Sequence, residues 1–415
     1  MSTYNINLHE AIYSLSDVLD LVGVTHIHHG KRVAFIASEC GKHLGWSGAR
    51  LDDLFQAAIL HDSGVSKTTV HAKLAQMEWE HEAEHCQTGA ELLAGCPLLK
   101  HLSDMVLYHH THWSTLKDID IPNELKLQAN CIYMADRLDV LALAHIVSEK
   151  DILLGKDEIR RKIYERRGDW FCPELVDALM EVSHSEAFWF ALEGEHVNGY
   201  VATWLSHFPD RAMEFHELRS LVHVFSCIVD AKSHFTKQHS DGVASLARYL
   251  GGLFQLPEVT CEMLELAGLL HDVGKLRVPD ELLEKPAKLT ENEFIVMQRH
   301  SFDTYNVLKN IRGLERVSTW ASQHHDRVDG TGYPYETKAS EISLEARIVA
   351  VADVFQALAQ RRPYRGPLEP QAILANLKEQ AQGGKLDGQV VSMVEANLQE
   401  CWRTALRPSE ATGRC

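Results

Sequence analysis

The chain has 415 residues, of which 45% are hydrophobic and 24% are charged, as in folded globular proteins. A chain of this length exceeds what one hydrophobic core usually serves, so two domains are expected. Its 41 basic and 58 acidic side chains leave a formal charge of −17, which argues against a surface that binds duplex nucleic acid. No apolar stretch reaches about 18 residues, so no membrane span is expected.

The N-terminus lacks the basic start and apolar stretch of a secretory signal. The nine cysteines are scattered along the chain and contain no CxxC pair. Both features predict a cytoplasmic protein with reduced thiols. The unusual number is 25 histidines. Histidine is the commonest metal-ligand side chain and the usual acid–base group, so this number of histidines indicates metal binding or acid–base chemistry.

Apolar residues recur at three- and four-residue spacing along most of the chain, which predicts helices. The clearest examples are residues 51–62 in the first half, and 211–232, 259–272, 301–314 and 370–398 in the second. Gly and Pro residues mark the turns between them, and the sequence has no run of alternating strands. The sequence therefore predicts an all-α fold.

The two halves carry the same order of metal-ligand residue types: His, His-Asp, His, His-His and Asp. Successive intervals are 32, 24, 24 and 27 residues in the first half and 32, 29, 24 and 29 in the second. The matched residues are His29, His61, Asp62, His85, His109, His110 and Asp136, then His239, His271, Asp272, His300, His324, His325 and Asp353. Such an internal repeat predicts two homologous domains. Pro209 and Asp210 interrupt two helical stretches, so we expect the domains at 1–208 and 209–415.

The seven residues of the second half suit a metal centre. Asp353 lies in an otherwise apolar helix, where a lone carboxylate is costly to bury unless it is paired or bound to metal. Five imidazoles and two carboxylates suit Fe, Mn, Zn and related ions. Because seven side chains exceed the needs of one ion, a two-metal site with Asp272 as the bridge is the economical interpretation. The same residue types make the first half a second candidate metal site.

The second half also carries HDVGK at 271–275 and HHDRVDGTGYP at 324–334. With these motifs, residues 211–405 resemble the HD-GYP family, a branch of the HD-domain metal-dependent phosphohydrolases. The first half resembles an HD domain without the GYP motif. The resemblance implies two tandem HD-type helical domains, the C-terminal one of HD-GYP type. The tandem arrangement is similar to that of bacterial phosphodiesterases that act on cyclic dinucleotides, including those that degrade 3′3′-cGAMP.

The resemblance implies a role for each matching position. The ligands of one metal ion would be His239, His271, Asp272 and Asp353. The ligands of its neighbour would be Asp272, His300, His324 and His325. Lys275 matches the family lysine that contacts the scissile phosphate, with Asp272 as the other catalytic residue. The substrate-binding positions are Gly332, Tyr333 and Pro334 in the GYP turn, and the phosphate-holding Arg362 and Arg365.

Two positions depart from the family pattern. Some members place a Glu four residues before the first His and bind a third metal there, but this chain has Phe235. Two divalent ions are therefore expected in the second half, with Fe or Mn favoured and Mg, Ni and Zn as alternatives. Gln356 stands three residues after Asp353, where the family often has Asp, and it leaves the tuning of the metal ligands open.

The first half lacks two features of the second. Val65 takes the position of Lys275, and no GYP turn follows His109 and His110. Three interpretations stay open: a second phosphohydrolase, since HD domains without GYP include nucleotide phosphomonoesterases, a regulatory domain that binds metal or ligand, or a degenerate packing module. If the first half is a second phosphohydrolase, the C-terminal half opens the ring of a cyclic dinucleotide, and the N-terminal half then removes the 5′-phosphate of the linear product.

The sequence thus predicts a metal-dependent phosphodiesterase that converts 3′3′-cGAMP or c-di-GMP to a 5′-phosphorylated linear dinucleotide. One alternative is an HD phosphohydrolase of a mononucleotide or an alarmone. Another is a non-catalytic scaffold that binds a cyclic dinucleotide. The expected partner is this small molecule, with neither duplex nucleic acid nor a membrane. The choice between the two dinucleotides, the native metal, the final product and a homodimer are left open by the sequence.

Overall fold

The computed structural model describes residues 3–22, 28–68, 83–147, 151–232, 239–360 and 366–406. It divides into two compact units, one formed by Leu8–Pro209 and the other by Asp210–Cys415 together with the residues ahead of Leu8. Residues 3–7 are expected in the first domain, but in the structure they belong to the second unit. The reason is that β1 (Thr3–Ile6) pairs antiparallel with β2 (Arg211–Glu214), which belongs to the second unit.

This two-stranded sheet is the exception among the described residues, whose other regular elements are all helical. The all-α fold class is confirmed, but the helix expected from residue 211 is wrong at its start. Residues 211–214 form β2, and α13 (Phe215–Asp230) begins afterwards at a capping box made by Glu214 and Glu217. The inward side chains of the sheet, Ile6 and Met213, are fully buried.

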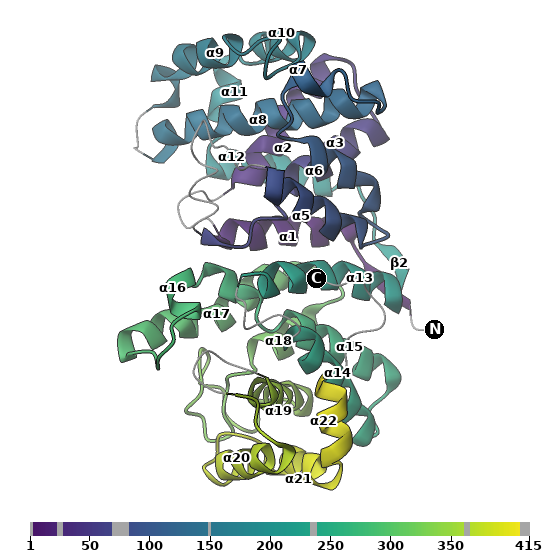
Figure 1. Ribbon diagram of the computed structural model, residues 1–415, viewed down its shortest axis with the longest axis vertical. Helices are drawn as coiled ribbons and strands as arrows, with labels where there is room; N and C mark the ends of the chain where they lie inside the picture. Colours follow the sequence, from purple (N-terminus) through teal and green to yellow (C-terminus); the bar gives the residue numbers. More distant parts are fainter. Residues whose placement is uncertain are drawn as a thin grey trace. The chain divides into compact units, whose positions relative to one another are not determined.

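The N-terminal unit is a helical bundle around α2 (His29–His43), which contacts α3 (Ala49–Ile59) and α8 (Asn123–Val147). Figure 1 shows these three helices in the middle of the unit. The remaining elements are α1 (Leu8–Val22), α5 (Ala83–Ala94), η1 (Lys100–Leu102), α6 (Ser103–Tyr108), α7 (Trp113–Leu116), η2 (Ile152–Leu154), α9 (Lys156–Tyr164), α10 (Pro173–Val182), α11 (Glu186–Phe190) and α12 (Gly194–Leu205).

The second unit is built around α19 (Leu344–Ala359), which contacts α14 (His239–Leu253) and α22 (Leu398–Leu406), as Figure 1 shows. Residues 370–398, predicted as helical, are divided into separate helices at Gly384, which has a positive φ of 74°. The remaining elements are α15 (Glu258–Leu270), η3 (Val273–Arg277), α16 (Asp280–Leu283), α17 (Glu291–Leu308), α18 (Glu315–Ser322), α20 (Pro370–Gln382) and α21 (Gly388–Ala396).

The internal repeat is visible in the elements as well as in the sequence. Helices α2, α3, α5, α6 and α8 of the first unit correspond in order to α14, α15, α17, α18 and α19 of the second. Each matched pair carries the same ligand position: the first His begins α2 and α14, and the last Asp lies in the middle of α8 and α19. The two units therefore deliver the same set of side chains from the same framework.

A glycine fixes the approach of the His-Asp turn to the helix that carries the third His. A Cβ at Gly274 would lie 1.9 Å from the carbonyl oxygen of His300, and one at Gly64 would lie 2.1 Å from that of His85. These separations are far below van der Waals contact, so the backbone can come this close only because glycine has no side chain. The same contact in both units holds the turn and the helix in register.

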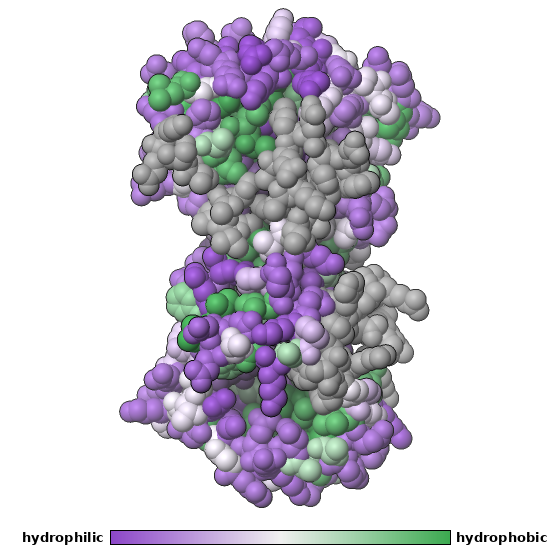
Figure 2. All heavy atoms as spheres, turned by 60° about the vertical axis from the view of Figure 1, so that its left-hand side comes forward, coloured by the Kyte–Doolittle hydropathy of each residue, from purple (hydrophilic) through white to green (hydrophobic). Residues whose placement is uncertain are grey.

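The face drawn in Figure 2 is predominantly hydrophilic in both units, with smaller apolar patches between the polar side chains. None of the helices in the described residues is both long enough and apolar enough to cross a lipid bilayer.

Gly274→Ala is expected to lower the free energy of unfolding by about 2 kcal/mol, because an added methyl group must displace packed backbone. Thermal denaturation of the full chain measures the change. Gly252→Ala is the matched control, since a Cβ at Gly252 in α14 meets no atom within 4 Å. Gly252→Ala should leave stability unchanged or raise it slightly. Equal stability of Gly274→Ala and wild type would contradict the close approach.

Candidate metal centres and active site

The seven predicted ligands of the second unit converge from five separate places in the chain. His239 begins α14, His271 and Asp272 follow α15, and His300 lies on α17. The remaining three are His324 and His325 after α18, and Asp353 on α19. Most of these side chains are buried and only His325 and Asp353 are half-buried. Residues up to 114 positions apart (353 − 239 = 114) thus form one enclosed polar cluster.

Asp272 lies between two groups of imidazoles. Its Oδ2 is 3.3 Å from His271 Nε2 and 3.8 Å from His239 Nε2. Its Oδ1 faces the other group, at 3.7 Å from His300 Nε2 and 3.9 Å from His324 Nε2. Each carboxylate oxygen therefore faces a different pair of ring nitrogens, which is the arrangement that a bridging ligand requires.

Two groups of ligand atoms flank this carboxylate. Within each group, the ligand atoms lie within 4.8 Å of one another. The groups are His239, His271 and Asp353, and His300, His324 and His325. In the first, Asp353 Oδ1 is 3.2 Å from His239 Nε2 and 3.7 Å from His271 Nε2. In the second, the Nε2 atoms of His300 and His324 are 3.4 Å apart.

Hydrogen bonds to the other ring nitrogen orient these imidazoles. The Nδ1 atoms of His271, His300 and His324 donate to the backbone carbonyl three residues earlier, at 2.8, 2.6 and 2.6 Å. Their Nε2 lone pairs therefore point into the cluster. Burial lowers the pKa of His300 to about 4 and that of His324 to about 3. Both rings are neutral near pH 7, the form that binds a metal ion.

The cluster fits a metal ion better than a set of hydrogen bonds. His271 Nε2 and Asp272 Oδ1 are buried and have no hydrogen-bond partner within the described parts of the chain. Burying a polar atom without a partner is costly, so such atoms in a native protein call for a ligand. Although burial raises the pKa of Asp272, His271 and Lys275 hold it well below its usual range. An ionised carboxylate beside the neutral imidazoles of His300 and His324 is a donor set for a divalent cation.

Lys275 and Tyr333 lie at the edge of this cluster. Lys275 Nζ donates to Asp272 Oδ2 at 2.6 Å and is partly exposed, so it can also reach a molecule that enters the site. The ring of Tyr333 lies 4.8 Å from that of His325, and the Tyr333 N–H donates to the His325 carbonyl at 3.2 Å. The GYP turn with Gly332 and Pro334 therefore forms a wall beside the ligands. The predicted Arg362 and Arg365, and also Phe235, lie outside the described residues.

The seven predicted residues of the first unit also converge. His29 Nε2 is 3.3 Å from Asp136 Oδ1 and 3.6 Å from Asp62 Oδ2. His85 Nε2 is 3.7 Å from Asp62 Oδ1. The two oxygens of Asp62 therefore face different imidazoles, as those of Asp272 do. The Nε2 atoms of His85 and His109 are 3.4 Å apart, as in the matching pair of the second unit. His61 and His110 approach Asp136 at 4.0 and 3.8 Å and complete the group.

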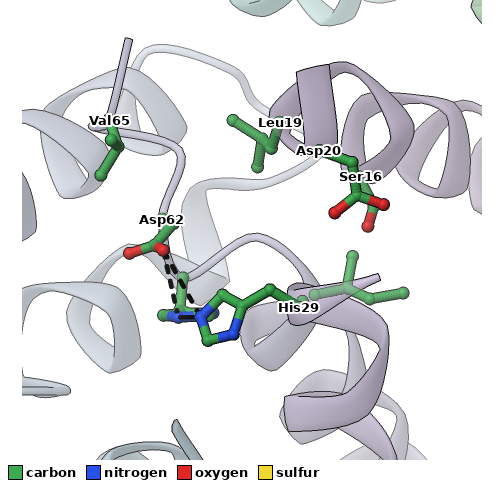
Figure 3. Close-up of a pocket in the computed structure, with 9 residues that line it drawn as sticks. Ser16, Leu19, Asp20, His29, Asp62 and Val65 are labelled. Atoms are coloured by element: carbon green, nitrogen blue, oxygen red, sulfur yellow. Dashed lines mark hydrogen bonds and ion pairs between the residues drawn. The ribbon is translucent and has the colours of Figure 1, made fainter. Parts of the chain in front are cut away.

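The surroundings of this first centre differ from those of the second. A small cavity of about 20 Å³ is lined by His29, His61, Asp62 and Val65, together with residues of α1. Figure 3 shows Val65 on the turn after Asp62, and the interactions of Asp62 with the imidazoles beside it. No lysine is among the residues that line this cavity. In the segment after His110, which carries no GYP turn, His112 stacks on Trp170 with ring centroids 4.9 Å apart.

Sequence reasoning missed the residues that support the first centre. Asp139 accepts a hydrogen bond from His29 Nδ1 at 2.7 Å and is paired with Arg32. Arg137 donates to Asp136 Oδ2 through both Nε and Nη2, at 3.0 and 2.7 Å. Asp139 stands three residues after Asp136, as Gln356 does after Asp353, so comparison of the two halves at this position could have found it.

Gln356→Met is expected to weaken metal binding to the second unit by roughly 10- to 100-fold, the usual cost of losing such a supporting contact. The reason is that His239 Nδ1 donates to Gln356 Oε1 at 2.6 Å, and Met has similar volume but accepts no comparable bond. Equilibrium dialysis against Mn²⁺ measures the affinity. Gln356→Glu retains the acceptor and should stay near the wild-type value. Equal affinities for the Met and Glu variants would show that this contact does not orient His239.

Comparison with known proteins places the chain in a family. HD domain models match residues 27–141 and residues 223–390, one in each unit. The chain is 36% identical over 410 residues to the 3′3′-cGAMP-specific phosphodiesterase 1 of Vibrio cholerae, covering 98% of this chain and 95% of that protein. A cyclic di-GMP phosphodiesterase of Pseudomonas aeruginosa is 42% identical over 132 residues, which is 32% of each chain.

A solved structure supports the fold. The crystal structure of a cyclic GMP-AMP specific phosphodiesterase from V. cholerae superposes with a TM-score of 0.64 at 23% identity, over 98% of this chain and 99% of that one. The pairs of HD motifs, their convergence in both units and the relationship along nearly the whole chain agree. The chain therefore belongs to the HD-domain phosphodiesterases, with one HD domain in each unit, and is related to the 3′3′-cGAMP-specific enzymes of Vibrio.

Proposed function

We propose that the second unit hydrolyses 3′3′-cGAMP to a 5′-phosphorylated linear dinucleotide. The observation that carries this proposal is the position of Asp272, with one oxygen toward each group of imidazoles and Lys275 bonded to it beside the GYP turn. Relatives that match 90% or more of the chain are specific for 3′3′-cGAMP by name, whereas a cyclic di-GMP phosphodiesterase matches about a third of it. Cyclic di-GMP is therefore the second candidate substrate.

Two divalent ions, Fe or Mn, are the proposed cofactors of this unit. One would be held by His239, His271, Asp272 and Asp353. The other would be held by Asp272, His300, His324 and His325. The two groups of ligand atoms, and the carboxylate that faces both, support two ions as the number. When bound, such ions act as Lewis acids on phosphoryl oxygens and lower the pKa of water.

The side chains of the second unit have distinct tasks in the proposed reaction. Lys275 offsets the negative charge that develops on the phosphate, at a position 2.6 Å from the central carboxylate. Gln356 and the backbone carbonyls keep the ring nitrogens aimed at the cluster. Tyr333 and its turn line one wall. Water adds to phosphorus in line with the departing 3′ oxygen, the P–O3′ bond breaks, and the 3′ oxygen takes a proton.

We propose a different reaction for the first unit, which is removal of the 5′-phosphate from the linear product. All seven ligand positions are filled there, and Asp62 faces imidazoles on both sides. Val65 takes the position of the lysine, and the segment after His110 has no GYP turn, whereas the proposed ring-opening site has both the lysine and the turn. A terminal phosphate is compact and needs fewer contacts than a cyclic dinucleotide. The two units would then act in sequence on one substrate.

Chromatography of the products tests the first proposal. The full chain is incubated with Mn²⁺ and, separately, with 3′3′-cGAMP, c-di-GMP and c-di-AMP. Wild type should convert 3′3′-cGAMP fastest, and Asp272→Ala should give no product. Lys275→Met should lower kcat by roughly 10²- to 10³-fold, the cost of losing one group that stabilises developing charge, with its metal content retained. No turnover of any of the three by metal-loaded wild type would overturn the proposal.

The second proposal predicts separate loss of the two activities. The His61→Ala/Asp62→Ala protein should open the ring at the wild-type rate but release less than about a hundredth of the inorganic phosphate. Asp272→Ala, supplied with the linear 5′-phosphorylated dinucleotide, should still release phosphate. Colorimetric phosphate measurement beside the chromatography follows both steps. Unchanged phosphate release by the His61→Ala/Asp62→Ala protein would assign the first unit to regulation or packing.

A further inference from the structure

The first centre contains a thiol where the second has a hydroxyl. Cys86 directly follows His85 on α5, and Ser301 directly follows His300 on α17. Because the two helices are matched elements of the repeat, the two side chains occupy the same position. Ser301 Oγ lies 3.3 Å from His300 Nε2. The corresponding Cys86 Sγ lies 3.7 Å from His85 Nε2 and 4.0 Å from His109 Nε2.

These separations match those within a tetrahedral metal site. With metal–nitrogen bonds of roughly 2.05 Å and a metal–sulfur bond of about 2.3 Å, two nitrogens lie about 3.4 Å apart, and nitrogen and sulfur about 3.6 Å. The Nε2 atoms of His85 and His109 are 3.4 Å apart. The distance of 3.7 Å from Cys86 Sγ to His85 Nε2 is close to the second value, and the distance of 4.0 Å to His109 Nε2 is somewhat longer. One ion can therefore contact both nitrogens and the sulfur at ordinary bond lengths.

The surroundings of the thiol favour a ligand role. The ligand atoms of His85, Cys86, His109 and His110 all lie within 4.8 Å of one another. Cys86 is 3% exposed, and its two histidine neighbours are buried as well. A fifth donor is close, since Asp62 Oδ1 is 3.7 Å from His85 Nε2. Three imidazoles, a thiol and a carboxylate are more ligands than one tetrahedral ion needs.

We propose that Cys86 is a thiolate ligand of the N-terminal centre and makes this centre select Zn²⁺. The thiol releases its proton to solvent as the sulfur–metal bond forms. Soft thiolate donors favour Zn²⁺, whereas carboxylate oxygens suit Mn²⁺. Because Cys86 adds a thiolate and the second centre has Ser301 at this position, the two centres select different metals. This proposal concerns metal binding alone and does not depend on whether the first unit removes phosphate.

Cobalt substitution tests the proposal without any activity measurement. Metal-free full-length protein is titrated with Co²⁺, and the near-ultraviolet thiolate-to-cobalt charge-transfer band is followed. Wild type should develop this band to a limit of one thiolate-bound ion per chain. Cys86→Ser and Cys86→Ala should both lose it and keep the visible cobalt bands. Cys172→Ser is the matched control, because Cys172 is another buried cysteine of the same unit and lies at the N-cap of α10, where Ser is well tolerated.

The outcomes separate the proposal from its alternatives. Loss of the band in both Cys86 variants with retention in Cys172→Ser supports it. No band in wild type with cobalt bound would show that the thiol only packs beside the histidines, and overturns it. A band that persists in the Cys86 variants would assign it to another cysteine, which also overturns it. In a competition between Zn²⁺ and Mn²⁺, Cys86→Ser should lower the preference of the first centre for Zn²⁺ on the order of tenfold.

Discussion

The buried carboxylate of Asp272 is the constraint around which the second unit is arranged. A charge removed from water must be compensated nearby, and here the compensation comes from His271, Lys275 and the cation that the surrounding ligands can hold. Those ligands arrive from five places in the chain, so helices α14, α15, α17, α18 and α19 must all keep their relative positions. The close approach of Gly274 in the His-Asp turn to the backbone of α17 is one consequence, because it fixes the distance between the turn and the helix.

Duplication of this framework has preserved the seven candidate ligand positions and changed the residues that hydrogen-bond to them. In the second unit, a Cβ at Gly242 would lie 2.6 Å from the Gln356 amide nitrogen, so a larger residue there conflicts with that glutamine. In the first unit, the matching pair is Arg32 and Asp139, which form a buried ion pair behind His29. In each unit the two residues suit each other: glycine leaves room for Gln356, and Arg32 neutralises Asp139. Supporting residues of this kind set the basicity and orientation of metal-binding imidazoles, so two centres with the same ligand types can differ in affinity and chemistry.

The fold class and the two clusters of His and Asp residues could be predicted from the sequence. Helical periodicity indicated the fold class, because amphipathic helices reveal themselves at three- and four-residue spacing. The paired intervals of His and Asp residues indicated both clusters, and the structure brings all fourteen residues together in two groups of seven. The repeat strengthens the prediction of two clusters, because the same order of His and Asp residues occurs in both halves. Helix ends were less well predicted, as at β2 and at Gly384, where pairing or a turn interrupts an otherwise helical pattern.

Residue identities and spacings alone specify the candidate ligands, their order and the division into two similar halves. What lies next to each of these side chains is set by the packing of the folded chain. The pairing of β1 with β2 joins segments about 200 residues apart, and no local pattern in a four-residue strand specifies its partner. The position of Cys86 beside two imidazole nitrogens likewise depends on how α5 packs against α6. Periodicity reports which face of a helix is buried, whereas the neighbours on that face are set by packing between helices.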